Sequence, residues 1–181
     1  MLNAKKKAVG IFGGSFDPPH KGHIEISKIS LRKLKIKKIY WIITKKNPFK
    51  SKSHFSIKER IELSKKALVG LKDMHILYLD DKIGSSRMID VISYFVKTRN
   101  QKDLYLILGS DNLLNFHKWT NWKKIVKLAK LVVFSRKGYD KKSKKSQVVK
   151  HLNKKNIIFI KNKLINMSSS NIIKDIIRNF K

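Results

Sequence analysis

The sequence contains no cysteine among its 181 residues, which excludes disulfide bonds, thiolate metal sites and cysteine nucleophiles. It also lacks any apolar run long enough to cross a bilayer. The charged start, Met1 to Lys7, is not followed by an apolar stretch of signal-peptide length. We therefore expect a cytoplasmic protein with no membrane partner. The length favours a single domain over residues 1–181, with enough chain to bury a core.

Acidic residues are scarce: 12 Asp and Glu stand against 43 Lys and Arg, giving a net charge of +31. Such a charge is typical of proteins that bind nucleic acid or another polyanion. The lysines are nevertheless spread along the chain, and only the tract 141–155 is dense. That tract lacks the interleaved arginine and aromatic residues that base stacking needs. We interpret the charge as a solvated lysine-rich surface that attracts small anions, and we do not expect a nucleic-acid partner.

Short apolar segments alternate with amphipathic ones, a pattern that predicts strands alternating with helices. Strands are expected at residues 8–12, 39–43, 74–79, 104–108, 131–134 and 157–160. Helices are expected after the N-cap Ser56, over residues 89–96, and after residues 168–170. The alternation predicts an α/β fold of three layers, Rossmann-like, with a mostly parallel sheet covered by helices on both faces. Ligands bind beyond the carboxyl ends of such strands, so segments 13–23 and 109–119 become the predicted site.

The first of these segments combines glycines with two histidines. Gly13 and Gly14 follow a predicted strand and let the backbone approach a ligand closely. His20 and His23 stand at a helix start, where both imidazoles can face one bound anion. They could instead bind zinc, but Asp17 is the only further ligand nearby. Neither common phosphate loop is present, so we assign phosphate binding to the histidines and backbone N–H groups and expect no metal ligands.

The second segment offers groups that suit a nucleoside. Asp111 follows Gly109 at the end of a predicted strand and can accept hydrogen bonds from ribose hydroxyls. Trp119 presents a flat face to a heteroaromatic ring, with added attraction for a cationic pyridinium. An N-cap aspartate and a core tryptophan would account for the same two residues, so both interpretations stay open.

A family resemblance extends this interpretation. Residues 20–23 match the H-x-G-H motif of the nucleotidyltransferase superfamily, and the string from Gly13 to His23 resembles the opening of bacterial nicotinate-nucleotide adenylyltransferase. The similarity runs through nearly the whole chain in matching order, including residues 168–170, which resemble the family's I-S-S-T/S-x-I-R motif. It implies transfer of AMP from ATP to nicotinate mononucleotide, a pyridine mononucleotide, giving deamido-NAD and pyrophosphate. Mg²⁺ would accompany ATP.

The resemblance also implies roles for individual residues. His20 and His23 would be catalytic and donate hydrogen bonds to phosphate oxygens. The implied ATP-binding residues are Gly13, Gly14, Ser15, Phe16, Gly109, Asp111, Ser168, Ser169 and Ser170. The implied substrate-binding residues are Asp17, Lys50, Met88, Trp119 and Arg136. Arg60, in the second helix, is interpreted as structural.

Two positions depart from the family pattern. Ile173 stands where the C-terminal motif has an arginine, which weakens the expected grip on ATP. Met88 stands near where the family has Ser-Tyr-Thr, so backbone N–H groups or Arg87 must recognise a pyridine carboxylate. The alternatives are an adenylyl- or cytidylyltransferase for another metabolite, such as nicotinamide mononucleotide or phosphopantetheine, and a catalytically impaired nucleic-acid-binding relative. A homo-oligomer is compatible with the sequence.

Overall fold

A computed structural model of the chain describes residues 8–45, 53–153 and 155–161. These residues contain a six-stranded sheet in which every neighbouring pair of strands is parallel. The spatial order is β3-β2-β1-β4-β5-β6. In chain order the strands are β1 (Val9–Gly14), β2 (Lys38–Ile43), β3 (Met74–Tyr78), β4 (Leu104–Gly109), β5 (Lys130–Phe134) and β6 (Ile157–Ile160).

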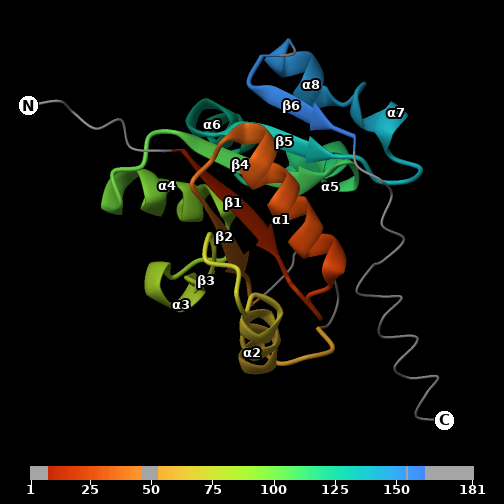
Figure 1. The fold of residues 1–181 in the computed structure, drawn as a ribbon. Coiled ribbons are helices and arrows are strands. Elements are labelled where there is room, and N and C mark those ends of the chain that lie inside the picture. The colour runs from red at the N-terminus through yellow and green to blue at the C-terminus, as the bar shows by residue number, and fades with distance from the viewer. Residues whose placement is uncertain (1–7, 46–52, 154, 162–181) are drawn as a thin grey trace, which may run out of the picture.

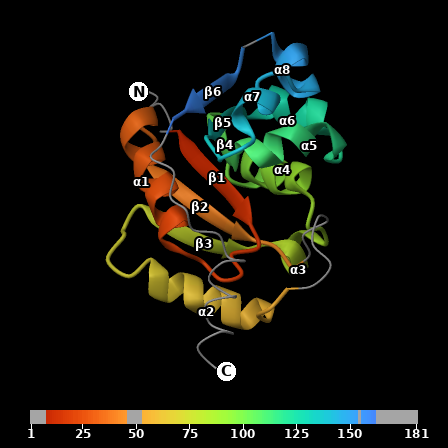
Figure 2. The ribbon, with the colours of Figure 1, turned by 90° about the vertical axis from the view of Figure 1, so that its right-hand side faces the viewer.

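Helices cover both faces of the sheet, which confirms the predicted three-layer α/β fold (Figures 1 and 2). One face packs against α1 (Lys21–Leu34) and α2 (Ile57–Ala67). The other packs against α4 (Met88–Thr98), α5 (Ser110–Asn115), η1 (Phe116–Lys118), α6 (Trp122–Leu128) and α8 (Gln147–Leu152). Two short helices, α3 (Asp80–Ile83) and α7 (Asp140–Ser143), follow β3 and β5.

The strands are apolar on both sides, which is why the sheet is buried between two helical layers. In β5, Leu131 and Val133 point into the cluster beneath α4 and α6, whereas Val132 and Phe134 point toward α1. All four side chains are buried. Successive residues of a strand face opposite sides, so this near-continuous apolar run fits a parallel sheet with two cores.

The strand order places a crevice at the centre of the sheet. The chain builds β1, β2 and β3 outward in one direction, and then returns to add β4 to the other side of β1. In open α/β sheets ligands bind where the order reverses, outside the carboxyl ends of the strands. Here that point lies beyond Gly14 of β1 and Gly109 of β4.

The predicted strands are all present, and the helix predicted after Ser56 begins as expected. Ser56 Oγ accepts a hydrogen bond from the Glu59 N–H at 3.3 Å, and a Glu59 carboxylate oxygen accepts one from the Ser56 N–H at 2.8 Å. This reciprocal pair is a capping box. The helix predicted after residues 168–170 lies outside the described residues.

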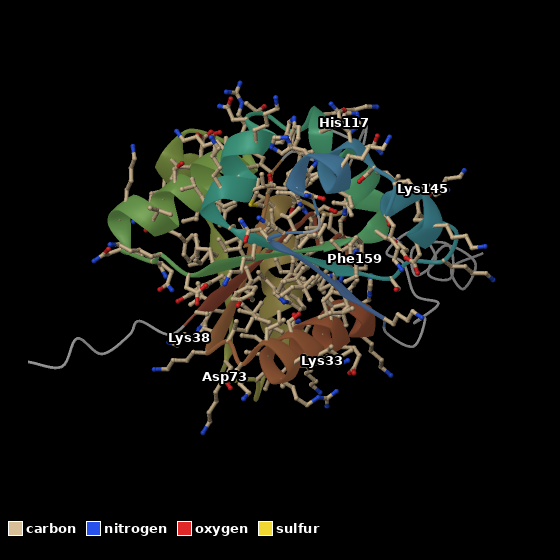
Figure 3. The ribbon with its side chains drawn as sticks, turned by 90° about the horizontal axis from the view of Figure 1, so that it is seen from above. Lys33, Lys38, Asp73, His117, Lys145 and Phe159 are labelled. Carbon is tan, nitrogen blue, oxygen red and sulfur yellow. The ribbon has the colours of Figure 1, made fainter. Side chains whose placement is uncertain are left out.

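The lysine-rich surface is distributed rather than gathered in one place. Lys33 and Lys145 are both exposed and lie on different sides of the molecule (Figure 3). The dense tract 141–155 contains most of α7 and all of α8, and Val148 and Val149 anchor it in the core. Over the described ranges, no helix is both long and apolar enough to span a membrane.

Candidate active site

Two histidines form the start of α1. His20 is the N-cap residue, with extended backbone angles, and its Nδ1 accepts a hydrogen bond from the Gly22 N–H at 3.1 Å. His23 Nδ1 accepts one in return from the His20 N–H at 3.2 Å. The rings stack with their centroids 3.8 Å apart. This is a capping box built from imidazoles, and it fixes both rings relative to the backbone.

The capping bonds also determine which ring nitrogen carries the proton. A ring that accepts through Nδ1 carries its N–H on Nε2, so each imidazole is a hydrogen-bond donor through Nε2. Burial, and after it the positive charge of Arg136, lower the pKa of His20 to about 4. His20 is therefore a neutral donor at physiological pH.

The sequence predicts that the main-chain N–H groups of this turn are available to a ligand, but two of them are used within the turn. The Gly22 N–H is bonded to the His20 ring, and the His23 N–H donates to the His20 carbonyl at 2.9 Å. The cap satisfies these two N–H groups, so neither is available to a ligand in this arrangement.

Aromatic side chains support the histidines from below. Phe16 is 1% exposed, with its ring 4.8 Å from that of His23 and stacked on Trp41 at 4.6 Å. The Trp41 indole N–H donates to Ser27 Oγ at 2.8 Å. Phe16 was predicted to bind ATP, but its side chain is part of the core and holds His23 in place. Only its backbone remains as a contact for a nucleotide.

Asp17 requires a similar correction. It was predicted to bind substrate, yet its side chain is 0% exposed. Its two carboxylate oxygens accept hydrogen bonds from the His54 and Phe55 N–H groups, both at 2.9 Å. Asp17 therefore ties the histidine loop to the segment that leads into α2. Both of its carboxylate oxygens already accept backbone hydrogen bonds, so the side chain is not placed to contact a substrate.

Arg60 of α2 connects the same loops and is structural, as expected. The residue is 2% exposed, and its guanidinium donates to the Ser15 and Thr44 carbonyls, both at 2.8 Å. A third bond, from Nε, reaches the Phe55 carbonyl at 3.2 Å. The contribution of Ser15 that the structure records is thus its carbonyl oxygen, which fixes the loop after Gly14.

The predicted residues Gly109, Asp111 and Arg136 meet at the ends of β4 and β5. Arg136 Nη1 and Asp111 Oδ2 form an ion pair at 2.6 Å, and the Arg136 N–H donates to Ser110 Oγ at 3.0 Å. A side chain at Gly109 would collide with Asp111 Oδ1, so any larger residue there would displace that carboxylate. The strands β1, β4 and β5 are parallel neighbours, so the loops that follow them leave the same edge of the sheet, where burial and then the charge of Arg136 lower the pKa of His20.

A cavity of about 370 Å³ lies beside this edge. Gly13 and Gly14 of β1 line it together with Met88 of α4 and Trp119. A side chain at Gly13 would collide with the terminal methyl of Met88, and the Trp119 indole N–H is buried without a hydrogen-bond partner among the described residues. Concave, mainly apolar sites with a few polar groups are typical of small-molecule binding.

Among the residues of this cavity that sequence reasoning missed is one buried carboxylate. Asp80 lies two residues beyond the end of β3, is 8% exposed, and lines the cavity. The rule that ligands bind beyond the carboxyl ends of strands applies to residues 79–80 as it does to residues 13–23, and it could have found Asp80.

Several predicted contacts lie outside the described residues: Lys50, Ser168, Ser169 and Ser170, together with the departure at Ile173. Among the residues that are described, no cluster of three His, Asp or Glu side chains could hold a metal ion. The described histidines and carboxylates therefore do not form a metal cage.

Comparison with known proteins agrees with the geometry. A family model described as cytidylyltransferase-like matches residues 11–175. A relative from Pelagibacter ubique, named a probable nicotinate-nucleotide adenylyltransferase, is 45% identical over 173 residues, covering 96% of each chain. A relative of the same name from Clostridium tetani is 39% identical over 173 residues, covering 93% of this chain and 85% of its own.

Solved structures share the fold. Nicotinic acid mononucleotide adenylyltransferase from Plasmodium falciparum, complexed with NaAD, superposes with a TM-score of 0.72 at 21% identity, covering 93% of this chain and 83% of that one. At that identity the match speaks for the fold alone. The family model and the relatives, by contrast, span almost the whole sequence. The chain therefore belongs to the cytidylyltransferase-like family, and within it to the nicotinate-nucleotide adenylyltransferases.

Proposed function

We propose that this protein transfers the adenylyl group of ATP to nicotinate mononucleotide, giving deamido-NAD and pyrophosphate. A phosphate oxygen of the mononucleotide attacks the α-phosphorus of ATP, and the bond from that phosphorus to the bridging oxygen of the β-phosphate breaks. No protein nucleophile is needed. Catalysis then rests on positioning the two substrates and on stabilising negative charge in the transition state.

The observation that carries this proposal is the histidine cap of α1. His20 and His23 are fixed by reciprocal backbone bonds, and each carries its proton on Nε2. Two donors held in place by the cap can bind the oxygens of the transferring phosphate without reorganising during the reaction. Arg136, at the same edge of the sheet, would add a positive charge for the phosphates.

The remaining site residues take the roles assigned from the sequence. Gly13 and Gly14 would let ATP approach the end of β1. Asp111 would accept hydrogen bonds from a ribose after Arg136 moves from its carboxylate to a phosphate. Trp119 would stack on the pyridine ring in the cavity beside Met88. Lys50 and Ser168 to Ser170 stay predicted contacts.

Mg²⁺ enters this proposal as part of the ATP substrate. When bound, it would neutralise the pyrophosphate oxygens. Among the described residues, no cluster of His, Asp and Glu could hold it without the ATP phosphates. The cytoplasmic location, in which ATP and mononucleotides are available, also stays a prediction.

An assay of pyrophosphate release tests the proposal and its alternatives together. The wild-type protein is given ATP with nicotinate mononucleotide, nicotinamide mononucleotide or phosphopantetheine, and each acceptor is repeated with CTP. We expect release with ATP and nicotinate mononucleotide to exceed every other pair in kcat/KM. A higher value for phosphopantetheine or for CTP would overturn the assignment, and His23→Ala shows how much of the signal is enzymatic.

A further inference from the structure

The cavity contains a carboxylate whose hydrogen bonds are only half satisfied. Asp80 Oδ2 accepts from the Lys45 N–H at 2.7 Å and from Thr44 Oγ1 at 3.1 Å. Asp80 Oδ1 is buried and has no hydrogen-bond partner among the described residues. Burying a polar oxygen without a partner is unfavourable, so a donor or cation on a bound ligand would stabilise this atom.

No positive side chain of the described residues pairs with Asp80. The ion pairs among the described residues involve Glu62, Asp103 and Asp111. Arg60 bonds the Thr44 carbonyl, but its guanidinium is taken up by carbonyl oxygens. Arg87 and Lys118 also line the cavity, and both are exposed to solvent. A buried carboxylate needs either a donor or a cation, and the described residues leave this one to the occupant of the cavity.

The chemistry of a pyridine mononucleotide narrows what that occupant can offer. Its phosphate and carboxylate are negative and would be repelled by Asp80. Its ring nitrogen carries a fixed positive charge. Trp119 lines the same cavity, and an indole face attracts cations. Apolar side chains such as Ile42 and Val91 form other walls, where an unbalanced charge is most costly.

We propose that Asp80 is the counter-ion of the pyridinium ring and selects charged over uncharged rings in this cavity. This inference rests on the proposed function, because it assigns one end of the same substrate. In a chain of net charge +31, the overall field attracts the phosphate but repels the pyridinium. The negative charge of Asp80 would offset the repulsion between this positive field and the pyridinium ring in the cavity.

Calorimetry with two ligands isolates the ring charge. One ligand is nicotinate mononucleotide, and the other is its 3-carboxyphenyl riboside 5′-phosphate, in which carbon replaces the charged nitrogen. An opposite charge at about 4–6 Å changes an ionisation equilibrium by about tenfold or more, so wild type should prefer the pyridinium by about tenfold. In Asp80→Asn the amide oxygen keeps the bonds to Thr44 and Lys45, and the preference should fall below about threefold, the part that Trp119 supplies.

Asp81→Asn is the matched control, because Asp81 is exposed on the same short helix and hydrogen-bonds Tyr78 rather than facing the cavity. It should keep the wild-type preference. Equal weakening of both ligands in Asp80→Asn would overturn the proposal and leave a structural or ribose-binding role.

Wild type alone also decides the matter if Asp80→Asn fails to fold, since a preference below about threefold refutes a counter-ion. Measuring pyrophosphate release distinguishes a failure of this inference from a failure of the proposed function. Turnover with nicotinate mononucleotide but no effect of ring charge defeats only this inference, whereas absence of turnover with any acceptor defeats the proposed function.

Discussion

Replacing Asp17 by alanine tests whether this residue positions the histidine loop or contacts substrate. The side chain accepts two backbone hydrogen bonds at 2.9 Å, from His54 and Phe55. A hydrogen bond to a charged group contributes about 1.5–3 kcal/mol, and we take the low end because His54 is exposed and water can reach its N–H. Asp17→Ala should therefore lower the free energy of unfolding by about 3 kcal/mol, and Asp17→Asn, which keeps one acceptor oxygen, by about half of that.

Urea unfolding followed by circular dichroism at pH 7 measures both losses. Asp73→Ala, at an exposed carboxylate, should change the free energy of unfolding by less than about 0.5 kcal/mol and serves as the control. A loss in Asp17→Ala no larger than in this control would refute the reasoning. If Asp17→Asn instead raised KM for the mononucleotide with stability unchanged, the original prediction of a substrate contact would be restored.

Further outcomes follow from the site. His23→Ala should lower kcat by about a hundredfold or more with the circular dichroism spectrum intact, the usual cost of one lost transition-state donor; near-normal turnover would contradict its role. Arg136→Ala should raise the pKa of His20 from about 4, since one cause of its lowering is removed, and an NMR titration of the imidazole would detect this. Because the pKa of folded His20 lies below its ordinary 6.5, its contribution to stability is complete above pH 6.5 and is lost as pH falls toward 4, which unfolding at a series of pH values measures. Gly13→Ala should raise KM for the mononucleotide, because the added methyl displaces Met88 in the cavity, while the melting temperature changes little.

Local sequence patterns predicted the parts of the molecule that depend on local physics. Strand positions followed from apolar runs, and the Ser56 cap from its spacing to Glu59. The histidine pair at the end of the first strand could be found because Gly13, Gly14 and the H-x-G-H spacing lie within eleven consecutive residues.

The end of a strand marks the position of Asp80, but the contacts of Phe16, Asp17 and Asp80 could not be predicted in the same way. Each depends on partners that the fold brings from elsewhere: Asp17 binds the Phe55 N–H 38 residues away, and Asp80 binds Thr44 36 residues away. A phenylalanine or an aspartate inside a binding motif has the same local pattern whether it faces a ligand or the core. Tertiary contacts decide between the two, and a single sequence does not contain them.

The way Arg60 is held has a consequence for how the protein tolerates change. Its charge is balanced by peptide oxygens, which every residue type carries, rather than by an aspartate or glutamate. Acidic side chains can therefore be lost around Arg60 without leaving its charge unbalanced, whereas the other tie of the histidine loop still depends on the carboxylate of Asp17.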